Sequence, residues 1–72
     1  MTNDRKDYLH IRETGEFVPT FPALSREDKA AIAALGDSHK GNEAMRVLIE
    51  KTQCSELEAK LWVLYRAKVF KL

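Results

Sequence analysis

The sequence is poor in cysteine, glycine and long apolar runs, and each shortage excludes a class of protein. Because Cys54 is the only cysteine, a disulfide framework and a four-cysteine zinc site are excluded, and a reducing, cytoplasmic location is favoured. No apolar stretch approaches the roughly 18 residues that a membrane-spanning helix requires, and the polar first residues lack the apolar core of a secretory signal. The three glycines are scattered, so no glycine-rich phosphate loop is present.

What remains is an ordinary globular composition. The 72 residues are 44% hydrophobic and 32% charged, which favours one folded domain over a disordered chain. Residues 1–7 are polar, and we expect them to form a flexible N-terminal arm. A single small helical domain is expected over residues 8–72.

Charge is distributed unevenly, although the net charge is only +1. Residues 59–72 contain four basic residues and no acid, whereas residues 1–58 carry a net charge of −3. A basic end of this kind can bind an acidic partner or a phosphate backbone. Alternatively, the cations gather there because the negative end of a helix dipole favours them.

The first part of the domain predicts a short β-hairpin and an extended connector. Residues 8–12 and 16–18 have strand-forming side chains and flank a turn signal at 14–15, while Pro19 and Pro22 exclude a helix directly afterwards. An isolated hairpin is marginal in water, so it must pack on the helices. The side chains available for that packing are Leu9, Ile11, Phe17 and Phe21.

Capping residues predict where the first two helices begin and end. Ser25 is a typical N-cap and Gly36 stands where a C-terminal glycine cap belongs, which predicts a helix over residues 26–35. Asn42 is expected to cap a second helix over residues 43–52.

A third helix is expected from residue 56 to the end of the chain, because Ser55 and Glu58 form a capping-box pattern. Its apolar residues occupy two sides, one that includes Leu57, Leu61 and Leu64 and another that includes Ala59 and Val63. A surface helix of a monomer normally has one apolar stripe. This helix is therefore either central in the domain, with the hairpin covering its far side, or in contact with a partner.

Residues 43–60 resemble the first two helices in the C-terminal domain of the bacterial ribosomal stalk protein. The matching segments are Glu43-Ala44-Met45-Arg46-Val47-Leu48, Thr52 and Glu58-Ala59-Lys60, about a quarter of the chain. The chain departs from that family at Gln53 and Ser55, which replace glycines, at Glu56, which replaces an apolar residue, and at Ile49, which replaces a basic one. In that family the helix pair docks translation factors through basic and apolar side chains. The resemblance therefore implies a protein-docking helical hairpin, with Arg46 and Lys60 at basic positions and Met45 at an apolar one.

A helix-turn-helix motif is a competing interpretation of the same residues. Residues 50–55 look like its turn, and the helix that follows would be the recognition helix, with Ala59 and Trp62 buried. Such a helix presents its first residues to base edges between phosphates. Here those residues include Glu56 and Glu58, whose carboxylates oppose binding to a polyanion, although glutamate can accept a hydrogen bond from cytosine.

The sequence offers little catalytic chemistry. Cys54 precedes a helix start, which can lower a thiol pKa, but catalysis would also need His10 or His39 beside it, and no spacing requires that contact. A small buried residue is the simpler role for Cys54. No spacing typical of a metal site links these three residues. We predict no enzyme activity, no cofactor and no metal.

The combined prediction is a mainly α, three-helix small domain with an N-terminal extended or β-hairpin segment. Its predicted function is a non-enzymatic protein-interaction module, and a second copy of the chain is one candidate partner, since so short a chain has difficulty burying a sufficient core alone. A dimeric nucleic-acid-binding regulator is the alternative, and no membrane contact is expected. The predicted contact residues are Arg46, Lys60, Trp62, Tyr65, Arg66 and Lys68.

Overall fold

The computed structural model describes residues 7–70, which fold into a two-stranded hairpin followed by four helices. The elements are β1 (Tyr8–Ile11), β2 (Glu16–Pro19), α1 (Arg26–Asp37), α2 (Gly41–Thr52), α3 (Glu56–Leu64) and α4 (Arg66–Val69). The mainly α fold with an N-terminal hairpin is thus confirmed. Most of the predicted arm (residues 1–6) and the end of the predicted third helix (residues 71–72) lie outside the described residues. No helix in the described range is long and apolar enough to cross a membrane.

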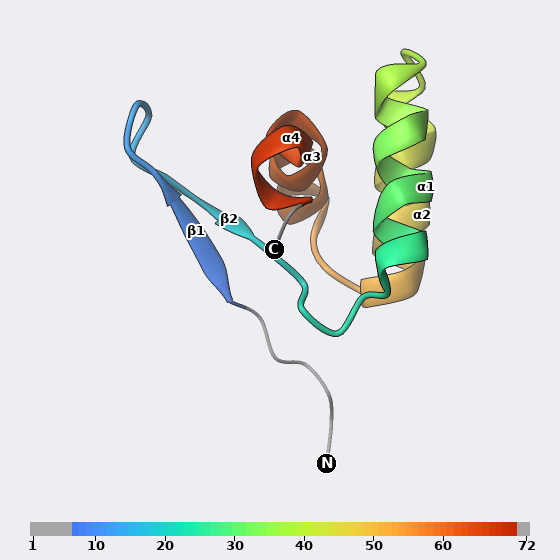
Figure 1. Cartoon of the computed structure of the whole chain (residues 1–72), viewed down its shortest axis with the longest axis horizontal. Helices are drawn as coiled ribbons and strands as arrows, with labels where there is room; N and C mark the ends of the chain where they lie inside the picture. Colours follow the sequence, from blue (N-terminus) through green and yellow to red (C-terminus); the bar gives the residue numbers. More distant parts are fainter. Residues whose placement is uncertain (1–6, 71–72) are drawn as a thin grey trace.

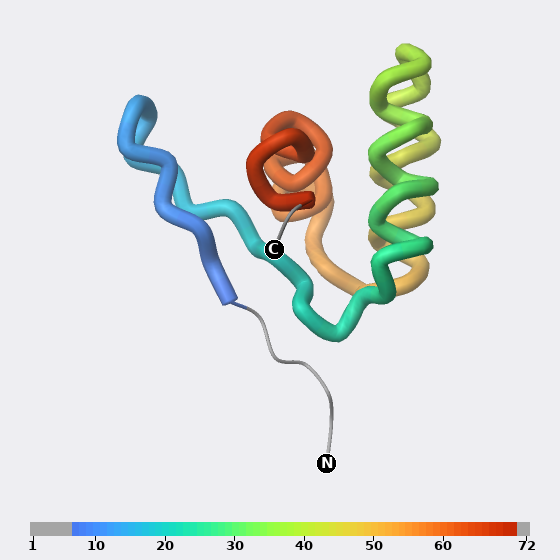
Figure 2. The backbone as a smooth tube through the Cα atoms, in the orientation of Figure 1, coloured from blue at the N-terminus to red at the C-terminus, as the bar shows by residue number. Residues whose placement is uncertain are grey.

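The elements form three layers with α3 in the middle (Figure 1). The hairpin lies on one side of α3 and α4, and the α1–α2 pair lies on the other. Figure 2 shows the connector that leaves the hairpin, passes below α3 and enters α1. Of the two alternatives for the predicted third helix, the structure shows the first, a central position in the domain.

The hairpin presents one apolar side to α3 and the other side to solvent. β1 and β2 are antiparallel, with Leu9 opposite Val18 and His10 opposite Phe17. Because side chains alternate along a strand, Val18 is fully buried, whereas Phe17 is 60% exposed and stacks on His10 with ring centroids 4.7 Å apart. The packing predicted for the hairpin is made by its inner face and not by Phe17.

Two features join the hairpin to the helices. The N–H and the hydroxyl of Thr20 both donate to the carbonyl of Asp7, at 2.8 and 3.0 Å, so this last residue of the predicted arm is held against the connector. Phe21 follows with a left-handed backbone (φ 48°) and a buried ring. The connector is therefore part of the core.

The first helix begins as predicted and ends later. The Ser25 hydroxyl accepts a hydrogen bond from the N–H of Asp28 at 3.1 Å, which confirms the N-cap. The predicted end at residue 35 is wrong, because α1 continues through Gly36 and Asp37 and its C-cap is Ser38. Gly36 is helical and does not have the positive φ of a glycine cap.

The second helix begins earlier than predicted and ends where expected. Its N-cap is Lys40, and no side chain caps it, so the prediction that Asn42 caps a helix starting at residue 43 is wrong. The helix ends at Thr52, and Gln53 adopts the left-handed conformation (φ 57°) that usually favours glycine. This backbone reversal turns the chain into α3.

The third predicted helix is two helices within the described residues. Ser55 and Glu58 form the expected capping box at the start of α3. The continuous helix expected beyond that point is wrong, because a turn at Tyr65 separates α3 from the four-residue α4. No glycine or proline causes this break. It coincides with a bond from Arg66 Nη1 to the carbonyl of Val63 at 2.8 Å, and it sends the fully buried Val69 into the core.

Candidate interaction surface

The six predicted contact residues divide into a core residue, two residues bonded to the hairpin and three near the α1–α2 side of α3. Trp62 has no exposed surface, because its ring fills the centre of the core between the hairpin and the helix pair. Its assignment as a contact residue is therefore wrong. The indole Nε1 has no hydrogen-bond partner among the described residues, so this side chain contributes through packing.

Tyr65 and Lys68 face the hairpin turn. The Tyr65 hydroxyl donates to Thr14 Oγ1 at 3.3 Å, and Lys68 Nζ lies 2.9 Å from Glu13 Oε1. These bonds hold the hairpin against α4. The polar atoms of both side chains therefore have partners within the chain and do not require an external partner.

The bond between Lys68 and Glu13 predicts a measurable shift in the pKa of Glu13. The hydrogen bond from Lys68 lowers the pKa of Glu13 below its ordinary value of 4.5, and the charge of Lys68 acts in the same direction. Because the pKa of Glu13 is lower in the folded state, the bond stabilises the fold at pH values above the ordinary pKa. This stabilisation is lost as the pH falls through the folded-state pKa. We expect Lys68→Met to return the pKa upward in a carboxyl ¹³C NMR titration. Roughly 1 M salt should act likewise, because it screens exposed charges, and a pKa that stays low in Lys68→Met would contradict the assignment.

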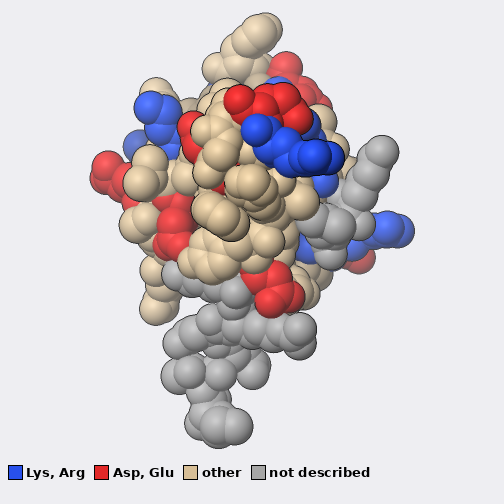
Figure 3. Space-filling view, turned by 90° about the vertical axis from the view of Figure 1, so that its left-hand side faces the viewer, with Lys and Arg blue, Asp and Glu red and all other residues tan. Residues whose placement is uncertain are grey.

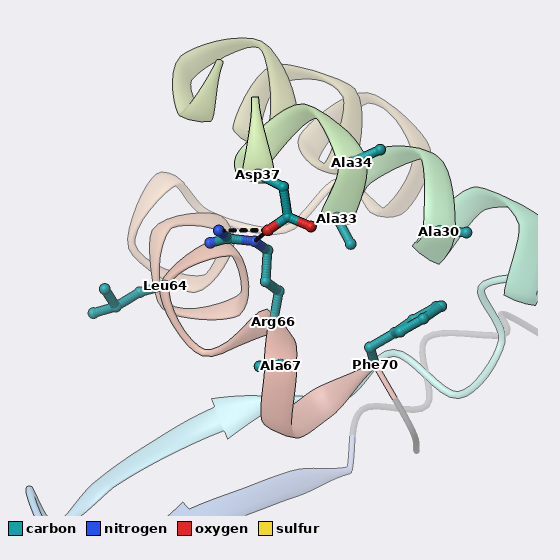
Figure 4. A pocket seen from close by; sticks show the side chains of 8 residues that line it. All are labelled: Ala30, Ala33, Ala34, Asp37, Leu64, Arg66, Ala67 and Phe70. Carbon is teal, nitrogen blue, oxygen red and sulfur yellow. Dashed lines mark hydrogen bonds and ion pairs between the residues drawn. The ribbon is translucent and has the colours of Figure 1, made fainter. Parts of the chain in front are cut away.

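Arg66 joins α4 to the end of α1. Its Nε and Nη2 both lie 2.7 Å from Asp37 Oδ1 (Figure 4). A methyl group built on Gly36 would approach the Arg66 Nε, Cδ and Cζ atoms to 3.0–3.2 Å. Gly36 therefore leaves room for the guanidinium, and this tertiary contact, not a helix cap, is its function in the fold.

This close approach predicts an energetic coupling between Gly36 and Arg66. Gly→Ala inside a helix normally stabilises it by roughly 0.5–1 kcal/mol. We expect that full gain for Gly36→Ala in an Arg66→Ala background, and a gain smaller by about 0.5 kcal/mol or more in the native background, where the methyl displaces the ion pair. Denaturant unfolding of the four proteins measures the difference. Equal gains in both backgrounds would show that Gly36 and Arg66 do not interact.

Three adjoining hollows lie along the side of α3 and α4 that faces α1 and α2, and we call them together the interhelical groove. The first, of about 370 Å³, is lined by Ala30, Ala33, Ala34, Asp37, Leu64, Arg66, Ala67 and Phe70. The second, of about 380 Å³, is lined by Gly36, His39, Gly41, Asn42, Met45, Lys60, Val63, Leu64 and Arg66. The third, of about 350 Å³, is lined by Asn42, Met45, Arg46, Ile49 and Glu56. The first and second hollows share Leu64 and Arg66, and the second and third share Asn42 and Met45, so the three hollows are neighbours.

Leu64 is the most exposed large apolar side chain of the groove. It is 62% exposed and lines both the first and second hollows. In Figure 4 it extends on the opposite side of Arg66 from Ala30 and Phe70. Leu57, seven residues earlier on α3, is equally exposed at 66% but lines none of the three hollows.

The groove brings together three of the six predicted contact residues, namely Arg46, Lys60 and Arg66. Sequence reasoning pointed to Met45 only through the resemblance to the stalk helix pair, and it missed Leu64 as a contact residue. The signal for Leu64 was present, since Leu57, Leu61 and Leu64 recur at helical spacing on one side of α3. The contribution of α1 carried no such signal, because the lining alanines are small and ordinary in a helix.

The residues considered for catalysis lie in different parts of the fold. Cys54 is buried in the turn between α2 and α3, His10 lies on the exposed face of β1, and His39 lies between α1 and α2. No group of three or more His, Cys, Asp or Glu side chains within residues 7–70 has the arrangement of a metal site. Figure 3 shows the hairpin side of the molecule, where an uncharged centre is bordered by charges of both signs.

The chain matches no protein-family model, and no curated protein or solved structure matches it either.

Proposed function

We propose that the chain is a non-enzymatic protein-interaction module that binds its partner through the interhelical groove. The observation that carries this proposal is Leu64, a large apolar side chain left mostly in water at the junction of two hollows. Covering such a side chain on binding releases the free energy of apolar burial. Lys60 lines the second hollow together with Leu64, and Arg46 lines the third hollow, which gives the apolar and basic combination that the resemblance to the stalk helix pair implies.

A matched pair of leucine variants tests the proposal. Leu57 and Leu64 are exposed to the same degree on one helix, so Leu→Gln at either position should alter stability by a similar, small amount. The whole chain is immobilised and incubated with lysate of its source organism, and the captured protein is identified and its affinity measured. We expect Leu64→Gln to weaken binding at least fivefold and Leu57→Gln to leave it within twofold. Equal effects of the two changes would contradict binding in the groove.

Sedimentation of the same variants identifies a self-associating chain. A dimer that Leu64→Gln dissociates and Leu57→Gln does not would make the partner a second copy. The nucleic-acid alternative is tested by retention on a DNA column, which should fall steeply as salt rises if phosphates are bound. Three features of α3 oppose that alternative: exposed Glu56 in its first turn, Glu58 engaged in the capping box, and two exposed leucines along the face that would enter the groove of DNA.

A further inference from the structure

The charged side chains that line the second hollow of the groove are all basic. Lys60, Arg66 and His39 line it together with the first residues of α2, and no carboxylate is among the described residues that line it. Arg66 is neutralised by Asp37, but no acidic side chain in the described part of the chain pairs with Lys60. The same holds for Arg46 in the neighbouring hollow, where Glu56 lines the wall without pairing with it.

Apolar side chains accompany these cations along the whole groove. Met45 joins the second and third hollows, and Leu64 joins the first and second. An occupant must therefore offer apolar side chains along one line and negative charge at its border. A nucleic acid offers the charge but leaves the leucine and methionine side chains uncovered by anything apolar.

The walls of the groove are helices, and this decides the form of the occupant. The two strands of the structure lie on the opposite side of α3, so a peptide in the groove has no strand edge to extend (Figure 1). Grooves between helices are instead filled by amphipathic helices, whose residues at i, i+3 or i+4 and i+7 enter successive hollows. Neighbouring hollows between helices therefore favour a helical occupant.

We propose that the partner presents an acidic amphipathic helix, whose apolar side contacts Met45 and Leu64 and whose carboxylates lie beside Lys60 and Arg46. This inference rests on the proposed function and specifies its partner. It assigns Lys60 the selective role, because a lysine without a partner among residues 7–70 favours acidic binders and gains a new ion pair in the complex.

A display library of random 16-residue peptides, selected on the whole folded chain, provides the probe. We expect selection to enrich peptides with Asp or Glu beside apolar residues at helical spacing. Their dissociation constants, measured by fluorescence anisotropy, should rise at least fivefold on Lys60→Glu. Arg12→Glu is the matched control: it makes the same change in net charge on the hairpin turn, outside the groove, and should change affinity less than twofold.

The outcomes separate this inference from the proposed function. The acidic partner is overturned if the selected peptides are neutral or basic, or if they bind Lys60→Glu as well as the native chain. In that case the groove is still the binding site if Leu64→Gln weakens the binding of these peptides. Peptides that are indifferent to Leu64→Gln overturn both proposals. Three further outcomes overturn the acidic helix. A selection that enriches nothing indicates that no peptide binds, and a dimer that depends on the groove indicates a second copy. Retention on DNA that Lys60→Glu abolishes indicates a nucleic acid.

Discussion

Replacing Trp62 with alanine is expected to lower the free energy of unfolding by about 3–5 kcal/mol. The indole is fully buried between the hairpin and the α1–α2 pair, so its removal leaves a cavity that the surrounding elements cannot fill without losing their own contacts. A domain of this size has a total stability on the order of 4–11 kcal/mol. The variant should therefore be largely unfolded under mild denaturant, as measured by circular dichroism at several urea concentrations.

Trp62→Phe is the informative control, because it retains most of the ring and deletes the indole N–H. That N–H is buried without a partner among the described residues, and an unsatisfied buried donor costs about 1–3 kcal/mol. Its removal offsets part of the cavity that the smaller ring leaves, so we expect Trp62→Phe to cost less than about 1.5 kcal/mol. If Trp62→Ala were as stable as the native chain and only impaired binding, the ring would be a contact surface and its place in the core would be wrong.

This result governs how binding experiments are interpreted. A charged residue at position 62 would abolish partner binding by unfolding the chain, and the loss would say nothing about the surface. Tyr65 and Lys68 carry a similar risk, because their polar atoms hold the hairpin turn. Leu64 and Lys60 are suitable positions, because their side chains are exposed and surface substitutions usually change stability little.

The parts of the fold that depend on near neighbours in sequence were predictable. The turn at residues 14–15, the Ser25 N-cap and the capping box of Ser55 and Glu58 each need only residues a few positions apart, and all three are confirmed. The end of α1 and the start of α2 were not predicted correctly. Gly36 continues a helix because α4 is packed beside it, and no pattern near residue 36 reveals that neighbour.

The candidate surface was predicted only in part, for the same reason. Periodicity showed that the third predicted helix had too many apolar residues for one stripe, but it could not decide which side the hairpin would cover. Trp62 is fully buried in the core cluster that includes Ile11 and Val18 of the hairpin, whereas Leu64 remains exposed. The break at Tyr65 also escaped prediction, because it has no helix-breaking residue. It is stabilised by the Arg66 bonds to Asp37 and to the carbonyl of Val63 and by burial of Val69.

Replacing Phe21 with alanine is the second change expected to have a large effect, again about 3–5 kcal/mol in the free energy of unfolding. The ring is only 4% exposed and lies in the connector that leads from the hairpin to α1. Phe17→Ala is the matched control, because it removes the same ring from a position that is 60% exposed. The ring there is mostly exposed and its ring contact is the stacking on His10, so we expect a cost below about 1 kcal/mol.

A glycine variant separates the packing of Phe21 from its backbone. At φ 48°, alanine bears the same left-handed strain as phenylalanine, whereas glycine relieves roughly 1 kcal/mol of it. We therefore expect Phe21→Gly to be no less stable than Phe21→Ala, although glycine normally makes a chain less stable than alanine does. In urea unfolding, both variants should be far less stable than Phe17→Ala. If Phe21→Ala cost no more than Phe17→Ala, the connector would not seal the core. The hairpin side of α3 would then be as open to a partner as the interhelical groove, and the reason for placing the partner on the groove side alone would disappear.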